Sequence, residues 1–241
     1  SWTELPGVEP NPRVATVREG VRLCREQALD GVLALGGGSV IDCAKGIAAG
    51  FYYDGDPWDL SAKKLTPERA LPIFTVLTMA ATGSEMDSIA VISNPETNEK
   101  ESFAGPCCYP AVSILDPTYT YSLPAAQTAA GTADIMSHTF ENYLSPIETN
   151  YLADSLAEAI LRSCVKYGPK AIETPDNYEA RANLMWNAAW AINGFLDMGK
   201  PVAWSVHRME HELSAFYDIT HGVGLAILTP NWMRYVLNET T

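Results

Sequence analysis

Basic residues are scarce in this sequence, and the scarcity limits what the protein can bind. Its 241 residues contain 16 Lys and Arg against 29 Asp and Glu, a formal net charge of −13 at pH 7. Binding to a nucleic-acid backbone requires a basic surface, so we expect no nucleic-acid partner. A nucleotide cofactor remains possible, because backbone N–H groups can bind phosphates without any side-chain charge.

Long apolar runs and paired cysteines are also missing. No apolar run approaches the roughly 20 residues that cross a bilayer, and no basic-apolar leader opens the sequence, so we expect no membrane association. The 5 cysteines form no CxxC motif, which predicts buried, reduced thiols in a cytoplasmic protein. No GxSxG motif occurs either, which leaves acyl transfer without support. With 47% hydrophobic residues, the chain can still build a folded core.

Helical and strand patterns alternate in the first half. Val17, Val21, Cys24 and Ala28 recur at helical spacing and predict a helix that ends near residues 30–31. Short continuous apolar runs are typical of strands in a parallel sheet that is covered on both faces. Such strands are predicted at 31–35, 73–79, 88–93 and 111–115, with a helix at 40–51 and a hairpin turn at 94–98.

The second half reads as entirely helical. After Asp116-Pro117 the β-branched runs give way to Ala, Leu, Met, Glu and Trp. Pro124 fits the first turn of a helix that continues through 133–143. Apolar residues at helical spacing predict further helices around 152–160 and 182–189. We therefore expect an α/β domain at 1–123 and a helical domain at 124–241.

Two Gly/Ser/Thr loops follow predicted strands. Gly36-Gly37-Gly38-Ser39 stands between a strand and a helix, and Thr82-Gly83-Ser84 follows the strand that ends near Met79. Glycines let a backbone approach a ligand closely, and a helix start offers unpaired N–H groups to an anion. Loops at the carboxyl ends of two strands are typical of a cofactor crevice in an α/β sheet. The alternative is a pair of tight turns without a ligand.

All four histidines fall in the helical half. Asp134 and His138 are four residues apart, His207 and His211 repeat that spacing, and His221 stands at a predicted helix start. This set has no thiolate and suits a divalent metal, Fe²⁺ or Zn²⁺, held by imidazoles and one carboxylate. A catalytic metal needs an open position, so one of the five should stay off the metal. A single histidine on such a helix is more often a capped or core residue.

Together these motifs resemble the iron-dependent (group III) alcohol dehydrogenases, in particular the clostridial-type butanol dehydrogenases. The segments that carry the resemblance are EPNP (9–12), GGGSVIDCAK (36–45), ATGSE (81–85), LDPTYTYSLP (115–124), GTADIMSH (131–138) and HRMEHELSAFYDITHGVGLAILTP (207–230). They are spread over nearly the whole chain. The resemblance implies a dehydroquinate synthase-like architecture, with a Rossmann-like parallel α/β half, truncated at its start, followed by an all-α domain. Members of the family extend further at both ends, so we expect this chain to be a fragment.

The resemblance also implies roles for individual residues. The metal, expected to be Fe²⁺ with Zn²⁺ as the alternative, would be bound by Asp134, His138, His207 and His221. His211 would be a catalytic residue beside the nicotinamide. The cofactor-binding residues would be Gly37, Gly38 and Ser39 at the pyrophosphate, Asp42, Thr78, Thr82, Ser84 and Lys100 along the path to the nicotinamide, and Asn11 near the ribose-phosphate end.

The expected function is hydride transfer between NAD(P)H and a short-chain aliphatic aldehyde such as butanal. The resemblance further implies a homodimer that acts on small alcohols and aldehydes. Two alternatives stay open: a metal-dependent polyol dehydrogenase on the same scaffold, and a catalytically incomplete metal-binding fragment. Abundant Trp, Met and Phe in the helical half favour an aliphatic substrate over a polyol.

Overall fold

The computed structural model describes residues 2–146 and 150–236. The chain divides into two compact units, which are described separately. The first unit comprises Ser1–Met79 and Ser84–Tyr119, and the second comprises Ala80–Gly83 and Thr120–Thr241. No helix in the described part of the chain is long and apolar enough to span a membrane.

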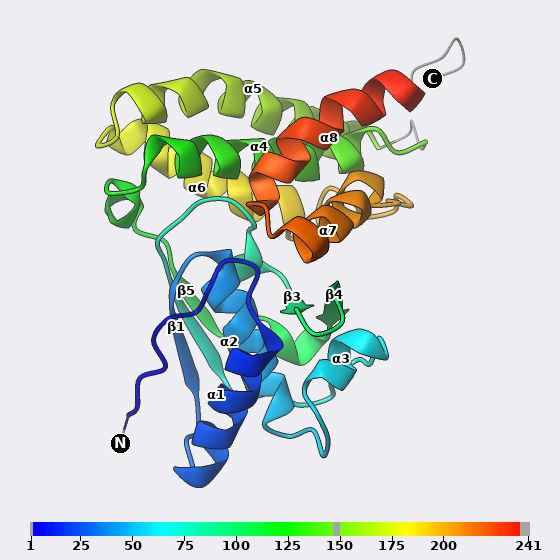
Figure 1. The fold of residues 1–241 in the computed structure, drawn as a ribbon. Helices are drawn as coiled ribbons and strands as arrows, with labels where there is room; N and C mark the ends of the chain where they lie inside the picture. Colours follow the sequence, from blue (N-terminus) through cyan, green and yellow to red (C-terminus); the bar gives the residue numbers. More distant parts are fainter. Residues whose placement is uncertain (1, 147–149, 237–241) are drawn as a thin grey trace. The chain divides into compact units, whose positions relative to one another are not determined.

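The first unit mixes helices and strands, as the alternating patterns predict (Figure 1). Its elements are α1 (Val14–Glu26), β1 (Val32–Gly36), α2 (Gly38–Gly50), α3 (Trp58–Ala62), β2 (Ile73–Leu77), β3 (Ile89–Asn94), β4 (Glu99–Ala104) and β5 (Val112–Ile114). Strands β1, β2 and β5 form a parallel sheet in the order β1-β2-β5, with Val32 opposite Ile73 and Val76 opposite Ile114. The prediction of a parallel α/β half is confirmed.

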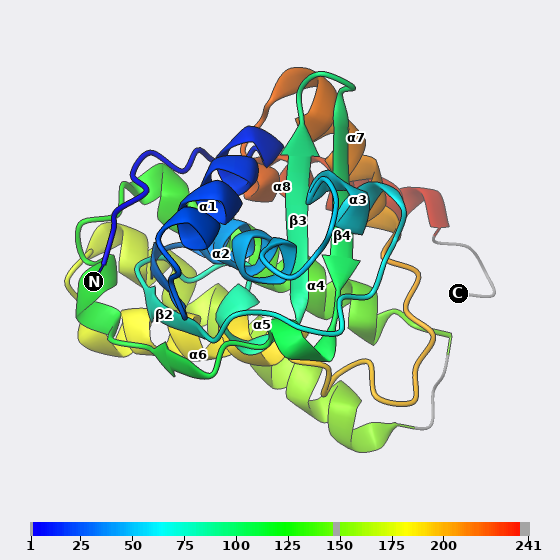
Figure 2. The ribbon, with the colours of Figure 1, turned by 90° about the horizontal axis from the view of Figure 1, so that it is seen from below.

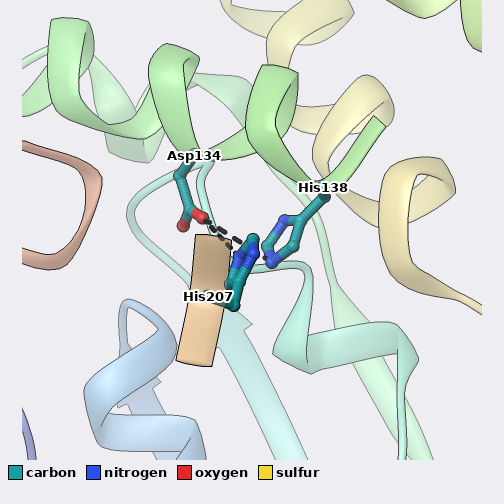
Figure 3. Close-up of side chains that lie close together, drawn as sticks. All are labelled: Asp134, His138 and His207. Atoms are coloured by element: carbon teal, nitrogen blue, oxygen red, sulfur yellow. Dashed lines mark ion pairs between the residues drawn. The ribbon is translucent and has the colours of Figure 1, made fainter. Parts of the chain in front are cut away.

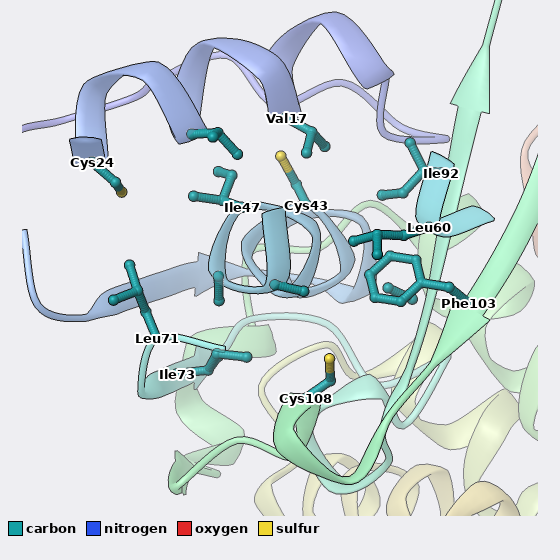
Figure 4. Close-up of a cluster of buried hydrophobic side chains, with 14 of the residues drawn as sticks. Val17, Cys24, Cys43, Ile47, Leu60, Leu71, Ile73, Ile92, Phe103 and Cys108 are labelled. Carbon is teal, nitrogen blue, oxygen red and sulfur yellow. The ribbon is translucent and has the colours of Figure 1, made fainter. Parts of the chain in front are cut away.

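One face of this sheet packs on α2, and α1 packs on α2 in turn to form the core of the unit (Figure 4). Val17, Val21 and Cys24 are buried on α1, as their helical spacing predicts. Helix α2 is buried from Ile41 to Gly50, which explains why this stretch has no polar stripe. Ala28 departs from the prediction: α1 ends at Glu26, and Ala28 follows it with φ 51°.

The prediction that the apolar strands are covered on both faces is wrong for the described residues. Leu33 and Leu35 on β1 are each 65% exposed. Phe74 on β2 is 42% exposed, and Val112 and Ile114 on β5 are 54% and 51% exposed. Side chains alternate between the two faces of a strand, and within the described ranges nothing covers the face opposite α1 and α2. An apolar run therefore does not establish how many faces of a strand are buried.

The segment predicted as a strand at 88–93 belongs to a different sheet. Strand β3 pairs with β4 in an antiparallel hairpin, with Ile89 opposite Ala104 and Asn94 opposite Glu99. The two arrows lie side by side in Figure 2. The predicted turn at 94–98 joins them, so the hairpin is confirmed. It forms a two-stranded sheet of its own instead of extending β1-β2-β5.

The second unit is helical in its described residues, and α4 lies at its centre. Its helices are α4 (Ala125–Tyr143), α5 (Tyr151–Glu173), α6 (Tyr178–Ile192), α7 (Ser205–Tyr217) and α8 (His221–Val236). Helix α4 packs against each of the other four (Figure 1). Pro124 stands one position earlier than predicted, as the N-cap of α4. The side chains of Asn150 and Asn177 accept backbone N–H groups at the starts of α5 and α6.

Candidate metal and cofactor sites

Asp134 of α4 is the centre of a cluster of imidazoles in the second unit (Figure 3). One carboxylate oxygen, Oδ1, lies 3.6 Å from Nε2 of His138, 3.8 Å from Nε2 of His207 and 3.7 Å from Nε2 of His221. Asp134 and His138 leave the same face of α4 because they are four residues apart. The structure thus brings together all four residues that the resemblance assigns to the metal.

The remaining imidazoles come from helices α7 and α8. His207 stands in the first turn of α7, and its ring stacks on that of His138 with centroids 4.5 Å apart and an interplanar angle of 15°. His221 is the first residue of α8. The next residue, Gly222, lets α8 approach α4 closely, because a Cβ there would stand 2.1 Å from the carbonyl oxygen of Ala130.

The donor set fits a divalent metal. Oδ1 of Asp134 and Nε2 of His207 are buried, and neither has a hydrogen-bond partner among the described residues. Unsatisfied buried polar atoms are costly unless something binds them. Bonds of about 2.0–2.2 Å to a tetrahedral metal place two ligand atoms about 3.3–3.6 Å apart, close to the observed separations. Three imidazoles and one carboxylate without a thiolate suit Fe²⁺ or Zn²⁺.

Burial and charge act in opposite directions in this cluster. Burial alone would raise the pKa of the Asp134 carboxyl, but its interactions with His138, His207 and His221 outweigh burial and hold that pKa below its ordinary value. Burial lowers the pKa of His138 to about 3, which keeps this imidazole neutral and able to bind a metal. Burial also disfavours the protonated form of His207. The carboxylates of Asp134 and Glu141 favour that form more strongly and raise the pKa of His207 to about 9.

His211 lies one turn after His207 on α7 and belongs to a neighbouring group. Its ligand nitrogen lies within 4.8 Å of ligand atoms of Glu210 and His221, whereas the group around Asp134 comprises His138 and His207. Its ring centroid is 5.8 Å from that of His221. The structure places His211 beside the cluster, half-buried.

Three residues of this site escaped the sequence analysis. Glu141 and Glu210 accept hydrogen bonds from the Nδ1 atoms of His207 and His221. The ring of Trp204 lies edge-on to those of His138 and His207. Helical spacing could have indicated both glutamates, because each lies three residues after a candidate ligand on the same helix.

The Gly-rich loop of the first unit joins β1 directly to α2. Gly37 is the N-cap of α2 and no side chain caps this helix start, so its first N–H groups are available for an anion. Gly38 is buried, and Gly37 and Ser39 are half-buried. The backbone N–H of Thr78 donates to the carbonyl of Gly36 at 3.0 Å, which holds the ends of β1 and β2 together at this loop. The arrangement fits a pyrophosphate.

The other predicted cofactor residues do not form one group in the structure. Asp42 and Ser84 bind each other, since the Ser84 hydroxyl donates to Asp42 at 2.6 Å, and Asp42 also accepts the N–H of Val91. Asn11 and Lys100 are buried in the same unit, and Asn11 has φ 52°. Thr82 belongs to the second unit. Their roles in cofactor binding stay predictions.

Comparison with known families identifies the chain. The family described as iron-containing alcohol dehydrogenase matches residues 1–117, and the C-terminal part of the Fe-containing alcohol dehydrogenase family matches residues 128–241. The chain belongs to the iron-containing alcohol dehydrogenases. The family resemblance read from the sequence motifs is thereby confirmed, and so is the dehydroquinate synthase-like architecture.

Relatives of this chain include two enzymes of Clostridium acetobutylicum. NADH-dependent butanol dehydrogenase A is 63% identical over all of this chain and 62% of its own length, and butanol dehydrogenase B is 65% identical over 99% of this chain and 61% of its own length. A crystal structure of NADH-dependent butanol dehydrogenase A from Thermotoga maritima superimposes with a TM-score of 0.95 at 47% identity, covering 98% of this chain and 59% of that one. The chain thus spans about three-fifths of the length of these relatives.

Proposed function

We propose that this chain forms the nucleotide- and metal-binding part of an NAD(P)H-dependent alcohol dehydrogenase that interconverts short-chain aliphatic aldehydes, such as butanal, and primary alcohols. The observation that carries the proposal is the convergence of three imidazole Nε2 atoms on one oxygen of Asp134 that has no hydrogen-bond partner among the described residues. The clostridial relatives, which are NADH-dependent butanol dehydrogenases, support butanol and butanal as substrates and favour NADH.

In this proposal Asp134, His138, His207 and His221 hold the metal, Fe²⁺ or alternatively Zn²⁺. When bound, it supplies a Lewis acid that polarises the substrate oxygen. The chain contributes three imidazoles and one buried carboxylate, a set whose single negative charge leaves a divalent site positive. Trp204 bounds the cluster with an aromatic ring, which suits an alkyl chain better than the hydroxyl groups of a polyol.

The first unit would bind the cofactor at the start of α2. Gly37, Gly38 and Ser39 would hold the pyrophosphate with backbone N–H groups, and residues 11, 42, 78, 82, 84 and 100 would line the remainder of the path. When bound, the nicotinamide supplies or accepts the hydride. We assign residues 1–123 to this nucleotide-binding domain and residues 124–241 to the metal-binding domain.

His211 would move the alcohol proton between the substrate and solvent. It lies next to the cluster and is half-buried, so its imidazole can contact the substrate on one side and solvent on the other. Imidazole is well suited to proton transfer near neutral pH. Replacing His211 with Ala should therefore lower turnover and leave metal content unchanged, whereas His207→Ala and His221→Ala should lose the metal.

The test is anaerobic reconstitution of the 241-residue chain with Fe²⁺, followed by metal analysis and oxidation of NADH and NADPH with butanal. We expect about one metal per chain, lost in Asp134→Ala, and metal-dependent turnover. A chain that binds the metal through these residues and turns over neither nucleotide would instead be a catalytically incomplete fragment. Faster reduction of NAD(P)⁺ with glycerol-like polyols than with butanol would favour the polyol dehydrogenase alternative.

We also propose a homodimer located in the cytoplasm. All five cysteines are free thiols in the structure, which suits a reducing compartment. Strand β1 is an edge strand of its sheet, and unpaired strand edges promote association between chains. Sedimentation velocity over a range of concentrations tests the dimer, and a monomer at every concentration would contradict it.

A further inference from the structure

Two of the three imidazoles around Asp134 are hydrogen-bonded through their second ring nitrogen to a buried glutamate. Nδ1 of His207 lies 2.5 Å from Oε1 of Glu141, and Nδ1 of His221 contacts Oε2 of Glu210. Glu141 is 6% exposed and Glu210 is fully buried. A carboxylate only accepts hydrogen bonds, so each Nδ1 donates to its glutamate, and Nε2 is the ring nitrogen left facing Asp134.

His138 provides an internal contrast. Its Nδ1 is buried and has no hydrogen-bond partner within the described ranges. Its ring is instead stacked on His207 and lies near Trp204. Thus a carboxylate fixes the ring nitrogens of His207 and His221, whereas packing alone orients His138.

Glu141 makes two further contacts that join helices. Its carboxylate accepts the backbone N–H of Val206 at 3.0 Å and that of His207 at 3.1 Å. Helix α7 has no side-chain cap from its own N-cap residue, Trp204, so Glu141 of α4 satisfies its first N–H groups instead. Asp134, His138 and Glu141 stand at positions i, i+4 and i+7 of α4, so a single helix face supplies two candidate ligands and the anchor for a third.

The carboxylate of Glu210 connects α7 to α8. Its Oε2 contacts His221, and its Oε1 accepts the hydroxyl of Ser214 from the same helix. A Cβ at Gly224 of α8 would stand 2.8 Å from Cγ of Glu210, so the glycine leaves room for this side chain. These contacts orient the imidazole of His221.

We propose that Glu141 and Glu210 are positioning residues that select Nε2 of His207 and His221 for the metal, and that Glu141 also couples metal binding to the docking of α7. The proposal rests on the proposed metal site at Asp134. It predicts that loss of either glutamate weakens metal binding, and that loss of Glu141 also weakens the folding of α7.

The experiment uses the 241-residue chain loaded with Co²⁺, whose visible absorption reports the ligand geometry. Affinity is measured by competition with a chelator for the parent chain, Glu141→Gln, Glu210→Gln and the exposed control Glu212→Gln on the same helix. Changes of this kind typically reduce metal affinity by about 10–100-fold. We expect such a loss and a shifted spectrum for both buried variants, no change for Glu212→Gln, and a lower Tm of the metal-free chain for Glu141→Gln.

Ser214→Ala provides a test that does not depend on Glu141→Gln folding. It removes the hydroxyl that holds Glu210 and leaves every candidate ligand and both glutamates in place, so a several-fold loss of Co²⁺ affinity is expected. Unchanged affinity and spectra in Glu210→Gln and Ser214→Ala would overturn the positioning role. If Asp134→Ala kept full Co²⁺ affinity, the proposed metal site itself would fail, which separates the two hypotheses.

Discussion

The indole ring of Trp204 lies edge-on to the imidazole of His207, with ring centroids 5.4 Å apart and an interplanar angle of 88°. Trp204 also has φ 52° and ψ 41° as the N-cap of α7. A bulky residue in the left-handed region costs roughly 1–2 kcal/mol. The strained conformation occurs at the residue whose ring contacts two candidate metal ligands. We therefore infer that the contact of the indole with His138 and His207 is important for the site.

Metal binding should therefore change the emission of Trp204. A paramagnetic ion such as Co²⁺ held by the neighbouring imidazoles quenches a nearby indole, so titration of the chain should reduce its tryptophan fluorescence. Trp204→Phe should abolish most of this quenching. Trp186→Phe is the matched control, because Trp186 is exposed on α6 and packs on Trp190. Equal quenching in all three chains would contradict the prediction.

Backbone strain at the same position can be separated from the ring contact. Trp204→Ala and Trp204→Gly both remove the ring, but only glycine adopts the left-handed region without cost. We expect Trp204→Gly to be more stable than Trp204→Ala by about 1 kcal/mol in urea unfolding. Alanine at equal or higher stability would show that this backbone conformation is not strained.

Local patterns in the sequence were sufficient for most elements and for the candidate ligands. Asp134 and His138 are four residues apart on one helix, and Gly36 to Ser39 join a strand to the next helix, so both features depend only on neighbouring residues. The contact of His207 with Glu141 joins residues 66 apart, and it depends on how α4 and α7 pack. The exposure of Leu33 likewise depends on what covers the sheet, which an apolar run does not encode.

The buried ion pair of Lys45 and Asp87 is another long-range feature that helical spacing does not reveal. Nζ of Lys45 is fully buried and lies 2.7 Å from Oδ1 of Asp87 and 2.8 Å from the carbonyl oxygen of Ile89. Removing one partner of a buried pair leaves an uncompensated charge, which typically costs about 3–5 kcal/mol. Lys45→Met should destabilise the chain by this amount in denaturant unfolding.

A surface pair gives the matched control for Lys45→Met. Lys63 pairs with Asp59 at 2.8 Å, but its side chain is 61% exposed. Exposed pairs contribute about 0–1 kcal/mol, so Lys63→Met should change stability by no more than this. In the double variant Lys45→Met/Asp87→Leu the unpaired charge is gone, and much of the stability should return. Similar losses in both single variants would disprove a special role for burial.

Glu85 should make stability depend on pH. It is 3% exposed, and neither carboxylate oxygen has a hydrogen-bond partner among the described residues. Burial raises its pKa from 4.5 to about 7. Because the folded state binds the proton more tightly, this group favours folding fully below about pH 4.5, and the contribution is lost as pH rises through about 7.

Glu85→Gln should therefore be more stable than the parent chain at pH 8 by roughly 1–3 kcal/mol, with little difference at pH 4. Urea unfolding between pH 4 and 8 measures this, and the slope of stability against pH should flatten in the variant. Glu96→Gln is the control, since Glu96 is exposed on the hairpin turn. A parallel pH profile for Glu85→Gln and the parent would show that Glu85 is not protonated in the folded chain.

Gly222 should be intolerant of any side chain, because it sets the distance between α8 and α4. A Cβ there would meet backbone atoms of Ala130 at 2.1 and 2.6 Å, and backbone cannot move aside as a flexible side chain can. Overpacking of this kind costs about 1–3 kcal/mol or more. Gly222→Ala should lower the free energy of unfolding by at least this amount.

The same substitution should weaken metal binding, since pushing α8 away from α4 moves His221 away from Asp134, now 3.7 Å distant. Val223→Ala, at the exposed next position of α8, should leave Co²⁺ affinity and unfolding nearly unchanged. Isothermal titration with Co²⁺ and urea unfolding together test both effects. If Gly222→Ala lost stability but kept full Co²⁺ affinity, the close approach of the two helices would serve packing alone, and His221 would not depend on it to reach the metal.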